Sequence, residues 1–337
     1  PLVVKKQKSV FMQNNISNFL FFLIFFFTVT GPSGADEVDF QSWLNSFRIE
    51  ALKKGISEKT IDHSLSGISP IPRVIQLDRK QPEFTLTFNQ YIKRVVTATR
   101  INKARKLYDA NKDLLSKVGN KYNVQPRFIV ALWGIESDFG RLTGGFKIVP
   151  ALATLAHDGR RSAFFRSQLF NALKIIDQGH ITAQNMKGSW AGALGQVQFM
   201  PSSFLAYAVD FDGDGRKNLW GSLGDVFGSA ANYLAKSGWK GDETWGRRVR
   251  LPPGFDKTLI NYKKIRHPIK FWQDAGVRKL NNTDLPNINM RASLVRPSDR
   301  ESETFLIYQN YRTILKWNRS HYFALAVGGL ADAIIQR

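Results

Sequence analysis

Apolar side chains recur at helical spacing along the first third of the chain. One stripe follows the i, i+3, i+4, i+7 pattern of an amphipathic helix, namely Phe40, Trp43, Leu44 and Phe47. Similar spacing continues at Ile92, Val95, Val96 and Ile101, and a turn-forming SPIPR segment at 69–73 separates the helical pieces. These patterns predict an N-terminal helical domain over residues 36–125.

A longer apolar run marks the middle of the chain. Residues 128–133 are all apolar, Pro126 suits a first helical turn and Gly140 suits a helix end, so a buried helix is predicted over 123–140. Further helical patterns cover 162–178, 201–209 and 225–237. We therefore expect a core domain over 126–238.

The pattern changes after residue 238. Pro and Asn become more frequent between 239 and 304, and short mixed segments such as 248–251 and 293–295 alternate with turns, which is typical of a small β-containing subdomain. A helical pattern returns at 322–335, and residues 305–337 are expected to form a C-terminal helix that returns to the core. The predicted fold class is α+β, mostly α.

Residues 1–35 are typical of a secretory signal. Three lysines within the first eight positions precede a 12-residue apolar run at 19–30, and Ser33, Gly34 and Ala35 form a small-x-small cleavage site. The run is short for a bilayer span, although an N-terminal membrane anchor is the alternative, and Met12 is an alternative initiator. We expect export, cleavage near Ala35 and no stable membrane anchor in the mature form.

The chain is strongly basic. Its 48 Lys and Arg against 27 Asp and Glu give a formal charge of +21, which calls for an anionic partner or surface. Export argues against nucleic acid, whereas an anionic cell-wall polymer fits both observations; a generically basic secreted protein is the alternative. The absence of cysteine excludes a disulfide scaffold, a thiol nucleophile and a lipid-modified cysteine. No HExxH or GxSxG motif indicates a zinc protease or a hydrolase elbow.

Glu136 is the most unusual carboxylate. On a helix its neighbours three, four and seven positions earlier are Trp133, Leu132 and Ile129. Loss of solvation there should raise its pKa and make it a proton donor near neutral pH, as glycosidic bond cleavage requires. The alternative is a Glu that reaches solvent or pairs with an Arg. Asp138 points about 200° away on a helix, which suggests that the substrate supplies the second catalytic group.

Two segments after residue 187 offer ligand-binding chemistry. Residues 188–204 combine glycines, which permit close ligand approach, with the amides of Gln196 and Gln198, although ordinary loop packing explains them equally well. Residues 210–218 resemble a calcium loop, with aspartates at positions 1, 3 and 5, Gly215 at position 6 and the Arg216 carbonyl at position 7. Gly221 occupies position 12, where an EF-hand has Glu, and Asp225 lies at position 16. An acidic turn without metal is the alternative.

Several of these motifs together resemble one family. WGIESDFGR, ALATLAHDGRR, GALGQVQFMPSSF, AVDFDGDGRKNLW and ANYLAKSGW are similar to segments of the B-type membrane-bound lytic murein transglycosylases and their soluble relatives, over most of 36–337. The resemblance implies a goose-lysozyme-like helical core flanked by a helical domain and a small β domain. Without a lipobox cysteine, the chain resembles a soluble, periplasmic member.

The resemblance implies an activity on peptidoglycan. Such enzymes cleave the β-1,4 bond between N-acetylmuramic acid and N-acetylglucosamine, and the muramyl 6-hydroxyl attacks C1 to leave a 1,6-anhydro end. One Glu serves as acid and then as base, and Glu136 stands at that position. The implied partner is the glycan strand, with no nucleic acid; complexes with other cell-wall enzymes are compatible with it.

The resemblance also implies roles for residues that are weak candidates alone, where core or surface packing is the default. Tyr91 and Tyr233 correspond to aromatic walls of the saccharide groove, and Arg160 and Arg161 to an arginine pair that faces lactyl or peptide carboxylates. Polar contacts to sugar are implied for Ser189, Gln198 and Asn318, the last preceded by Trp317 where the family has Tyr. Structural Ca²⁺ is implied at Asp210, Asp212, Asp214, the Arg216 carbonyl and Asp225, with no cofactor for catalysis.

Three rival functions remain at this point. A hydrolytic muramidase would admit water to the site and would be favoured by a second carboxylate. A non-catalytic peptidoglycan-binding or scaffold protein would use the same groove without cutting. A secreted polyanion binder would bind DNA tightly and would be indifferent to Glu136.

Overall fold

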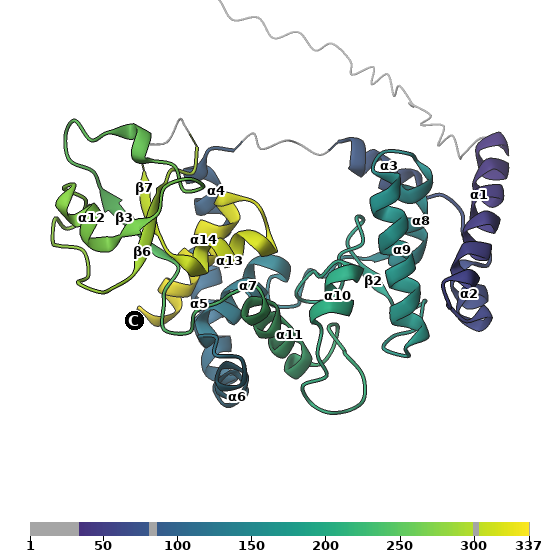
Figure 1. Ribbon diagram of the computed structural model, residues 1–337. Coiled ribbons are helices and arrows are strands. Elements are labelled where there is room, and N and C mark those ends of the chain that lie inside the picture. Colours follow the sequence, from purple (N-terminus) through teal and green to yellow (C-terminus); the bar gives the residue numbers. More distant parts are fainter. Residues whose placement is uncertain (1–33, 81–85, 299–302, 337) are drawn as a thin grey trace, which may run out of the picture.

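The computed structural model describes residues 34–80, 86–298 and 303–336 (Figure 1). Most of the predicted signal segment 1–35 lies outside these ranges; its last two positions, Gly34 and Ala35, begin helix α1. Within the described residues, no helix has the length and apolar character needed to cross a membrane.

One group of helices forms the end of the molecule at the right of Figure 1. Helices α1 (Gly34–Lys53), α2 (Glu58–Leu65) and α3 (Pro72–Arg79) pack against α8 (Ile148–His157) and α9 (Ser162–Asp177). The stripe predicted on α1 faces this contact, because Phe40, Leu44 and Phe47 are buried. Ser57 caps α2 by accepting a hydrogen bond from the Thr60 N–H, and a proline at the first position starts α3.

A second group of helices surrounds α7 (Pro126–Ser137) in the middle of the molecule. Helices α5 (Ala98–Ala110), α11 (Leu223–Lys236) and α14 (His321–Ile335) pack on α7, whose residues 128–134 are all buried. The group also contains α4 (Phe88–Val95), α6 (Lys112–Tyr122) and α13 (Gln309–Trp317), while α10 (Pro201–Tyr207) bridges α9 and α11. Packing thus crosses the predicted boundaries at 125 and 238, and the domain division stays a prediction.

Several helix ends differ from the sequence-based expectation by a few residues. The helix expected to reach Gly140 ends at Ser137, because Asp138 and Phe139 take left-handed backbone angles with φ of 50° and 60°. The stripe at 92–101 is divided between two helices, since Thr97 caps α5 by accepting from the Arg100 N–H. Helix α8 had no predicted counterpart, because its apolar run shows no polar face.

A five-stranded antiparallel sheet in the order β4-β6-β7-β3-β5 forms the opposite end of the molecule. Its strands are β3 (Gly246–Arg250), β4 (His267–Pro268), β5 (Arg278–Lys279), β6 (Arg291–Val295) and β7 (Thr304–Ile307), accompanied by the 3-10 helix η1 (Lys257–Leu259) and by α12 (Ile269–Asp274). Strand β7 lies at the centre, where Leu306 pairs with Leu294 and Arg247. The segment expected to be purely helical after 304 therefore begins in a strand.

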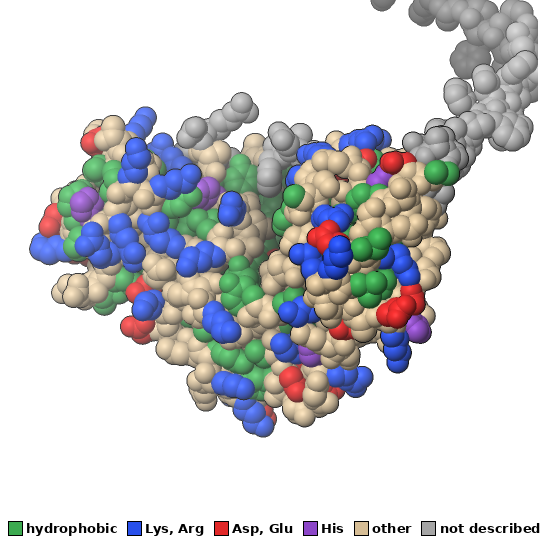
Figure 2. All heavy atoms as spheres, turned by 45° about the vertical axis from the view of Figure 1, so that its right-hand side comes forward, with side chains coloured by type: hydrophobic (Ala, Val, Ile, Leu, Met, Phe, Trp, Pro, Cys, Tyr) green, Lys and Arg blue, Asp and Glu red, His purple; other side chains and the backbone are tan. Residues whose placement is uncertain are grey.

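These parts lie in a row and leave a cleft between them. The mostly helical structure with one small sheet confirms the predicted α+β fold class. Figure 2 shows a hollow between the two halves of the molecule, with hydrophobic side chains on its floor and Lys and Arg side chains gathered on the sheet end.

Two further short strands, β1 (Phe146–Lys147) and β2 (Lys187–Gly188), pair with each other in antiparallel orientation.

Candidate active site

Glu136 lies in the last turn of α7, one residue before the helix ends. Its neighbours Leu132 and Trp133 are buried, and the loss of solvation raises the pKa of Glu136 to about 7, against the opposing effect of a hydrogen bond from Trp317. The negative end of the α7 dipole acts on the carboxylate in the same direction as burial. Glu136 can therefore hold a proton near neutral pH, as the sequence predicts.

Trp317, the last residue of α13, contacts Glu136 directly. Its indole Nε1–H donates a hydrogen bond of 2.8 Å to Glu136 Oε1. The indole packs on Tyr233 and Phe199, with ring centroids 4.7 and 5.2 Å away. These ring contacts hold the donor in place, so one carboxylate oxygen of Glu136 is fixed while the other stays available for chemistry.

The two tyrosines singled out from the sequence have different surroundings. Tyr91, on α4, is half-buried, and its pKa is raised by burial and by the nearby charge of Glu136. It lines a depression of about 360 Å³ together with Arg94, Arg100 and Ile135. Tyr233, on α11, is only 9% exposed, and its hydroxyl donates to the Lys316 carbonyl at 2.8 Å. Tyr91 thus lies near the Glu136 carboxylate, whereas Tyr233 contacts Trp317 and helps to hold it in place.

Asp138, the acid nearest to Glu136 in sequence, forms ion pairs with neighbouring basic side chains. Its carboxylate lies 2.6 Å from Arg141, 3.5 Å from Lys103 and 3.9 Å from Arg100. Burial would raise the pKa of Asp138, but Arg141 and Lys103 outweigh it and hold the pKa below its usual range. Asp138 is therefore engaged in ion pairs with three cations.

The glycine-rich segment packs against the end of α7 through a chain of hydrogen bonds. Ser137 Oγ donates to the Gln196 carbonyl at 2.6 Å, and the Gln196 side chain accepts from Trp133 Nε1 at 2.7 Å. A Cβ at Gly140, whose φ is +80°, would lie 2.3 Å from Gln196 Oε1, so only glycine fits there. This network anchors the turn that follows Glu136.

Ser189 and Gln198 both make hydrogen bonds that shape the same segment. Ser189 Oγ accepts from the Ala193 N–H at 2.9 Å. Gln198 has a φ of 50°, and its side-chain amide donates to the carbonyls of Thr143 and Gly195 at 3.1 and 2.8 Å. Both side chains remain partly exposed, so each keeps capacity for a ligand contact.

The arginine pair lies between α8 and α9 and shares one acid. Arg160 Nη1 lies 3.2 Å from Asp78 Oδ2 and donates to the Asp78 carbonyl at 2.6 Å, and Arg161 pairs with Asp78 Oδ1. Asp78 is fully buried, whereas the arginine side chains are 51% and 43% exposed. Sequence reasoning did not single out Asp78, because its partners are 82 and 83 positions away.

Asn318 follows directly after α13 and is exposed. Its Oδ1 accepts from the Ser320 N–H at 3.0 Å. Together with Pro297 and residues 319–322 it lines a depression of about 490 Å³. The residue before it, Trp317, was expected from the sequence only to pack among apolar side chains. Its hydrogen bond to Glu136 was not predicted.

The acidic loop brings three carboxylates together. Asp210, Asp212 and Asp214 each offer an oxygen, and these atoms all lie within 4.8 Å of one another. Backbone N–H groups hold all three, because Asp210 accepts from Gly213 and Gly215 at 2.7 and 2.8 Å, Asp212 from Asp214 at 3.3 Å, and Asp214 from Arg216 at 2.8 Å. Hard oxygen donors in this arrangement suit Ca²⁺.

Asp225 has a different role in the loop. It is fully buried, and its two oxygens accept from the N–H groups of Phe211 and Asn218 at 2.7 and 2.6 Å. It therefore ties the two ends of the loop to the start of α11. Asp225 is not among the three acids that converge.

Comparison with known proteins identifies relatives over most of the chain. Residues 39–332 match the family described as "Transglycosylase SLT domain". Membrane-bound lytic murein transglycosylase B of Escherichia coli is 32% identical over 298 residues, covering 84% of this chain and 79% of the relative.

Solved structures give the same result. SltB3 from Pseudomonas aeruginosa, in complex with NAG-NAM-pentapeptide, has a TM-score of 0.86 at 42% identity, covering 88% of this chain and 80% of that one. The Escherichia coli lytic transglycosylase Slt35 in complex with calcium has a TM-score of 0.72 at 30% identity, covering 89% and 93%. The fold seen here is therefore the fold of these lytic transglycosylases.

Proposed function

The chain belongs to the transglycosylase SLT domain family, whose members are lytic murein transglycosylases, and we propose that Glu136 is the one catalytic carboxylate of this member. The proposed reaction cuts the β-1,4 bond between N-acetylmuramic acid and N-acetylglucosamine and forms 1,6-anhydromuramyl ends. The observation that carries it is a carboxyl group with a pKa near 7 at the end of a buried helix, held by Trp317.

In the first step, Glu136 gives its proton to the glycosidic oxygen as the bond to muramyl C1 breaks. The substrate's own acetamide stabilises the cation that develops at C1. In the second step, the muramyl 6-hydroxyl attacks C1 and returns its proton to Glu136, which restores the acid. No second protein carboxylate is required, which agrees with the commitment of Asp138 to Arg141 and Lys103.

Trp317 supports both steps. Its N–H stabilises the carboxylate formed after proton transfer, and its packing on Tyr233 helps to keep the proton-bearing oxygen aimed at the substrate. Tyr91 lies near enough for the charge of Glu136 to raise its pKa, and we place it at the wall of the glycan groove. Tyr233 contributes indirectly, because its ring packs against the indole of Trp317.

The remaining polar candidates are proposed to orient the glycan. Ser189 and Gln198 are partly exposed and Asn318 is exposed, so each keeps hydrogen-bonding capacity for a sugar. Arg160 and Arg161 each use part of their guanidinium on Asp78 and leave the rest exposed, which suits a lactyl or peptide carboxylate.

Calcium is proposed as a structural ion of the loop 210–216. The three converging aspartates and the Arg216 carbonyl would hold it, and the ion would offset the mutual repulsion of the carboxylates. The solved Slt35 structure with calcium supports this assignment.

The proposed location is the periplasm, after export directed by residues 1–35. Residues 36–337 carry a formal charge of +18, which would favour adsorption to the anionic peptidoglycan, and this adsorption should weaken as salt screens it. Binding to sacculi that ignores salt would contradict this part of the proposal.

The decisive experiment incubates the purified protein with isolated peptidoglycan sacculi, with the Glu136→Gln variant in parallel, and identifies products by mass spectrometry. Anhydromuramyl products from the parent chain alone support the proposal. Reducing-end products, heavier by one water, would instead indicate a muramidase. Binding without any product would indicate a non-catalytic peptidoglycan-binding protein.

A further inference from the structure

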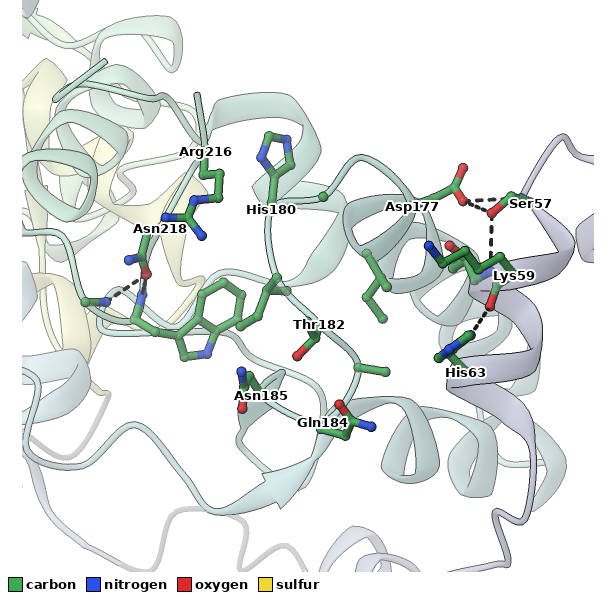
Figure 3. A pocket seen from close by; sticks show the side chains of 17 residues that line it. Ser57, Lys59, His63, Asp177, His180, Thr182, Gln184, Asn185, Arg216 and Asn218 are labelled. Atoms are coloured by element: carbon green, nitrogen blue, oxygen red, sulfur yellow. Dashed lines mark hydrogen bonds between the residues drawn. The ribbon is translucent and has the colours of Figure 1, made fainter. Parts of the chain in front are cut away.

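A separate cavity of about 780 Å³ opens between α2, the end of α9 and two loops at 179–185 and 216–221 (Figure 3). We call it the α2–α9 cavity. Its lining includes neither Tyr91 nor Trp317, which lie beside the candidate catalytic group. It is therefore a second place where a ligand of moderate size fits, since cavities of roughly 300–1,000 Å³ bind small molecules.

Hydrogen-bonding side chains line the α2–α9 cavity on three sides. Figure 3 shows Lys59 and His63 on α2 at one side and Arg216 and Asn218 on the loop at the other. Between them lie the exposed side chains of Thr182, Gln184 and Asn185. Amide and hydroxyl groups of this kind both donate to and accept from sugar hydroxyls and acetamides.

An aromatic ring and an oriented histidine complete the lining. Trp220 is half-buried, and its Nε1–H donates to the Lys187 carbonyl at 2.8 Å, so the indole is held in one orientation. His180 Nδ1 accepts from the Lys217 N–H at 3.2 Å, which leaves Nε2 as the protonated donor of the neutral ring. A fixed aromatic surface beside polar groups suits the apolar face of a sugar.

The charges of the lining favour an acidic ligand. Among the described residues that line the cavity, Asp177 is the one acid, and its Oδ1 already accepts from the N–H and Oγ of Ser57. The cations are Lys59 and Arg216, of which Arg216 lies 3.5 Å from Asp214. Lys59 is exposed and forms no ion pair with a described acid, so it is the cation available to a carboxylate in the cavity.

We propose that the α2–α9 cavity is a second peptidoglycan-binding site, which takes a sugar ring on Trp220 and a peptide-stem carboxylate on Lys59. The identity of this ligand rests on the proposed function, because the substrate is a polymer that repeats the same acidic unit. A second site holds the protein on one part of the polymer while Glu136 acts on another, which raises the effective local concentration of substrate.

The test must leave the catalytic group undisturbed. Trp220 is unsuitable for substitution, because its indole packs on Phe204 and donates to the Lys187 carbonyl, so that its loss would disturb more than the cavity. Lys59 and Asn185 are exposed. The double variant Lys59→Glu/Asn185→Ala therefore removes a cation and an amide from the cavity alone. Lys112→Glu, at an exposed position of α6, is the matched charge control.

The probe is NAG-NAM-pentapeptide, which contains no bond from NAM to NAG and so is not cut. Titration calorimetry of the parent and of Lys112→Glu should show two sites, and the double variant should show one site unchanged and the other about tenfold weaker or lost. One site in all three proteins would overturn the inference. Amide NMR shifts over 179–185 on titration should accompany binding; shifts confined to residues around Glu136 would overturn it as well.

Two further probes separate the parts of the ligand. An N-acetylglucosamine oligosaccharide lacks the carboxylates, and the free pentapeptide lacks the sugar, so each should perturb 179–185 more weakly than the intact unit. Equal binding by the free pentapeptide would overturn the saccharide contact. Product analysis on sacculi is independent: anhydromuramyl products with only one binding site refute this inference, and two sites without products refute the proposed function.

Discussion

The indole N–H of Trp317 donates a 2.8 Å hydrogen bond to Glu136 Oε1, joining residues 181 positions apart. The bond stabilises the ionised form of Glu136, while burial stabilises the protonated form and prevails. The balance between these two effects sets the proton affinity of the proposed catalytic acid. A substitution that removes the Trp317 hydrogen bond should therefore shift the pKa of Glu136.

Replacing Trp317 by Phe keeps the aromatic packing and removes the donor. The pKa of Glu136 should rise further, and kcat should fall by about tenfold, because the carboxylate formed in the reaction loses a stabilising hydrogen bond. The measurement is the pH profile of anhydromuramyl release, whose alkaline limb should move to higher pH. Trp43→Phe, on α1, is the control and should leave the profile in place; an unmoved profile in Trp317→Phe would contradict the assigned role.

The pH dependence of the parent enzyme follows from the sign of the Glu136 shift. Its pKa is raised to about 7, so the acid is protonated below that pH and loses its proton above it. kcat/KM should therefore fall about tenfold for each pH unit above about 7. Initial rates on soluble glycan strands between pH 5 and 9 test this, and a rate that stays level up to pH 9 would exclude Glu136 as the general acid.

Replacing Glu136 by Gln should lower turnover by about 10²–10⁴-fold, because an amide cannot deliver the proton. The fold should be retained, since Gln has nearly the same shape and can still accept the Trp317 hydrogen bond. Far-ultraviolet circular dichroism and binding to sacculi check this second expectation. Full turnover by the variant would show that another group supplies the proton.

Calcium should stabilise the protein if the loop 210–216 binds it. At a concentration of 100 times Kd the gain is about 2.7 kcal/mol, which corresponds to a rise in Tm of several degrees. Calorimetric scans with Ca²⁺ and with a chelator give the difference, and Asp212→Asn should abolish most of it. Asp242→Asn, an exposed acid outside the loop, should keep the full calcium effect.

Because Asp78 is buried, we expect the loss of its two arginines to destabilise the protein more than the loss of the Asp78 charge itself. Removing Arg160 and Arg161 together leaves Asp78 as a buried charge without its two cations, which should cost about 3–5 kcal/mol of unfolding free energy. Asp78→Asn should cost less, because the half-exposed arginines can then turn to solvent. Urea unfolding of both variants measures the difference, and equal costs would contradict the electrostatic explanation.

Local patterns predicted the elements better than the contacts between them. The apolar run at 128–133 and the prolines at 126 and 201 placed α7 and α10 correctly, because these signals act within a few residues. Glu136 could be singled out for the same reason. The pairing of Trp317 with Glu136 and of Asp78 with the arginines depends on chain segments brought together by packing, which short-range patterns do not encode.

Strand β7 shows that short-range sequence patterns were also insufficient to predict the sheet. Its four residues are buried on both faces, so the sequence lacks the alternation that marks a half-exposed strand. Only the register with β3 and β6 places it at the centre of the sheet. The acidic loop was an easier case, since all of its converging carboxylates lie within five residues.

Two adjacent glycines of α14 allow a matched test of the packing around α7. A Cβ at Gly328 would lie 2.4 Å from the ring of Trp245, whereas a Cβ at Gly329 meets nothing within 4 Å. Trp245 cannot move easily, because its Nε1–H donates to Asp332 at 2.9 Å, and Arg127 pairs with the same carboxylate at 3.1 Å. The close approach of α14 to Trp245 therefore depends on the missing side chain of Gly328.

Gly328→Ala should destabilise the protein by about 1–3 kcal/mol, because overpacking outweighs the helix-forming advantage of alanine. Gly329→Ala should instead stabilise it by up to about 1 kcal/mol, since alanine is the better helix former where space is open. Thermal unfolding of the two variants should thus shift in opposite directions. Stabilisation by both substitutions would mean that Trp245 is free to move away, and that the contact between α14 and the sheet end is looser than its hydrogen bonds indicate.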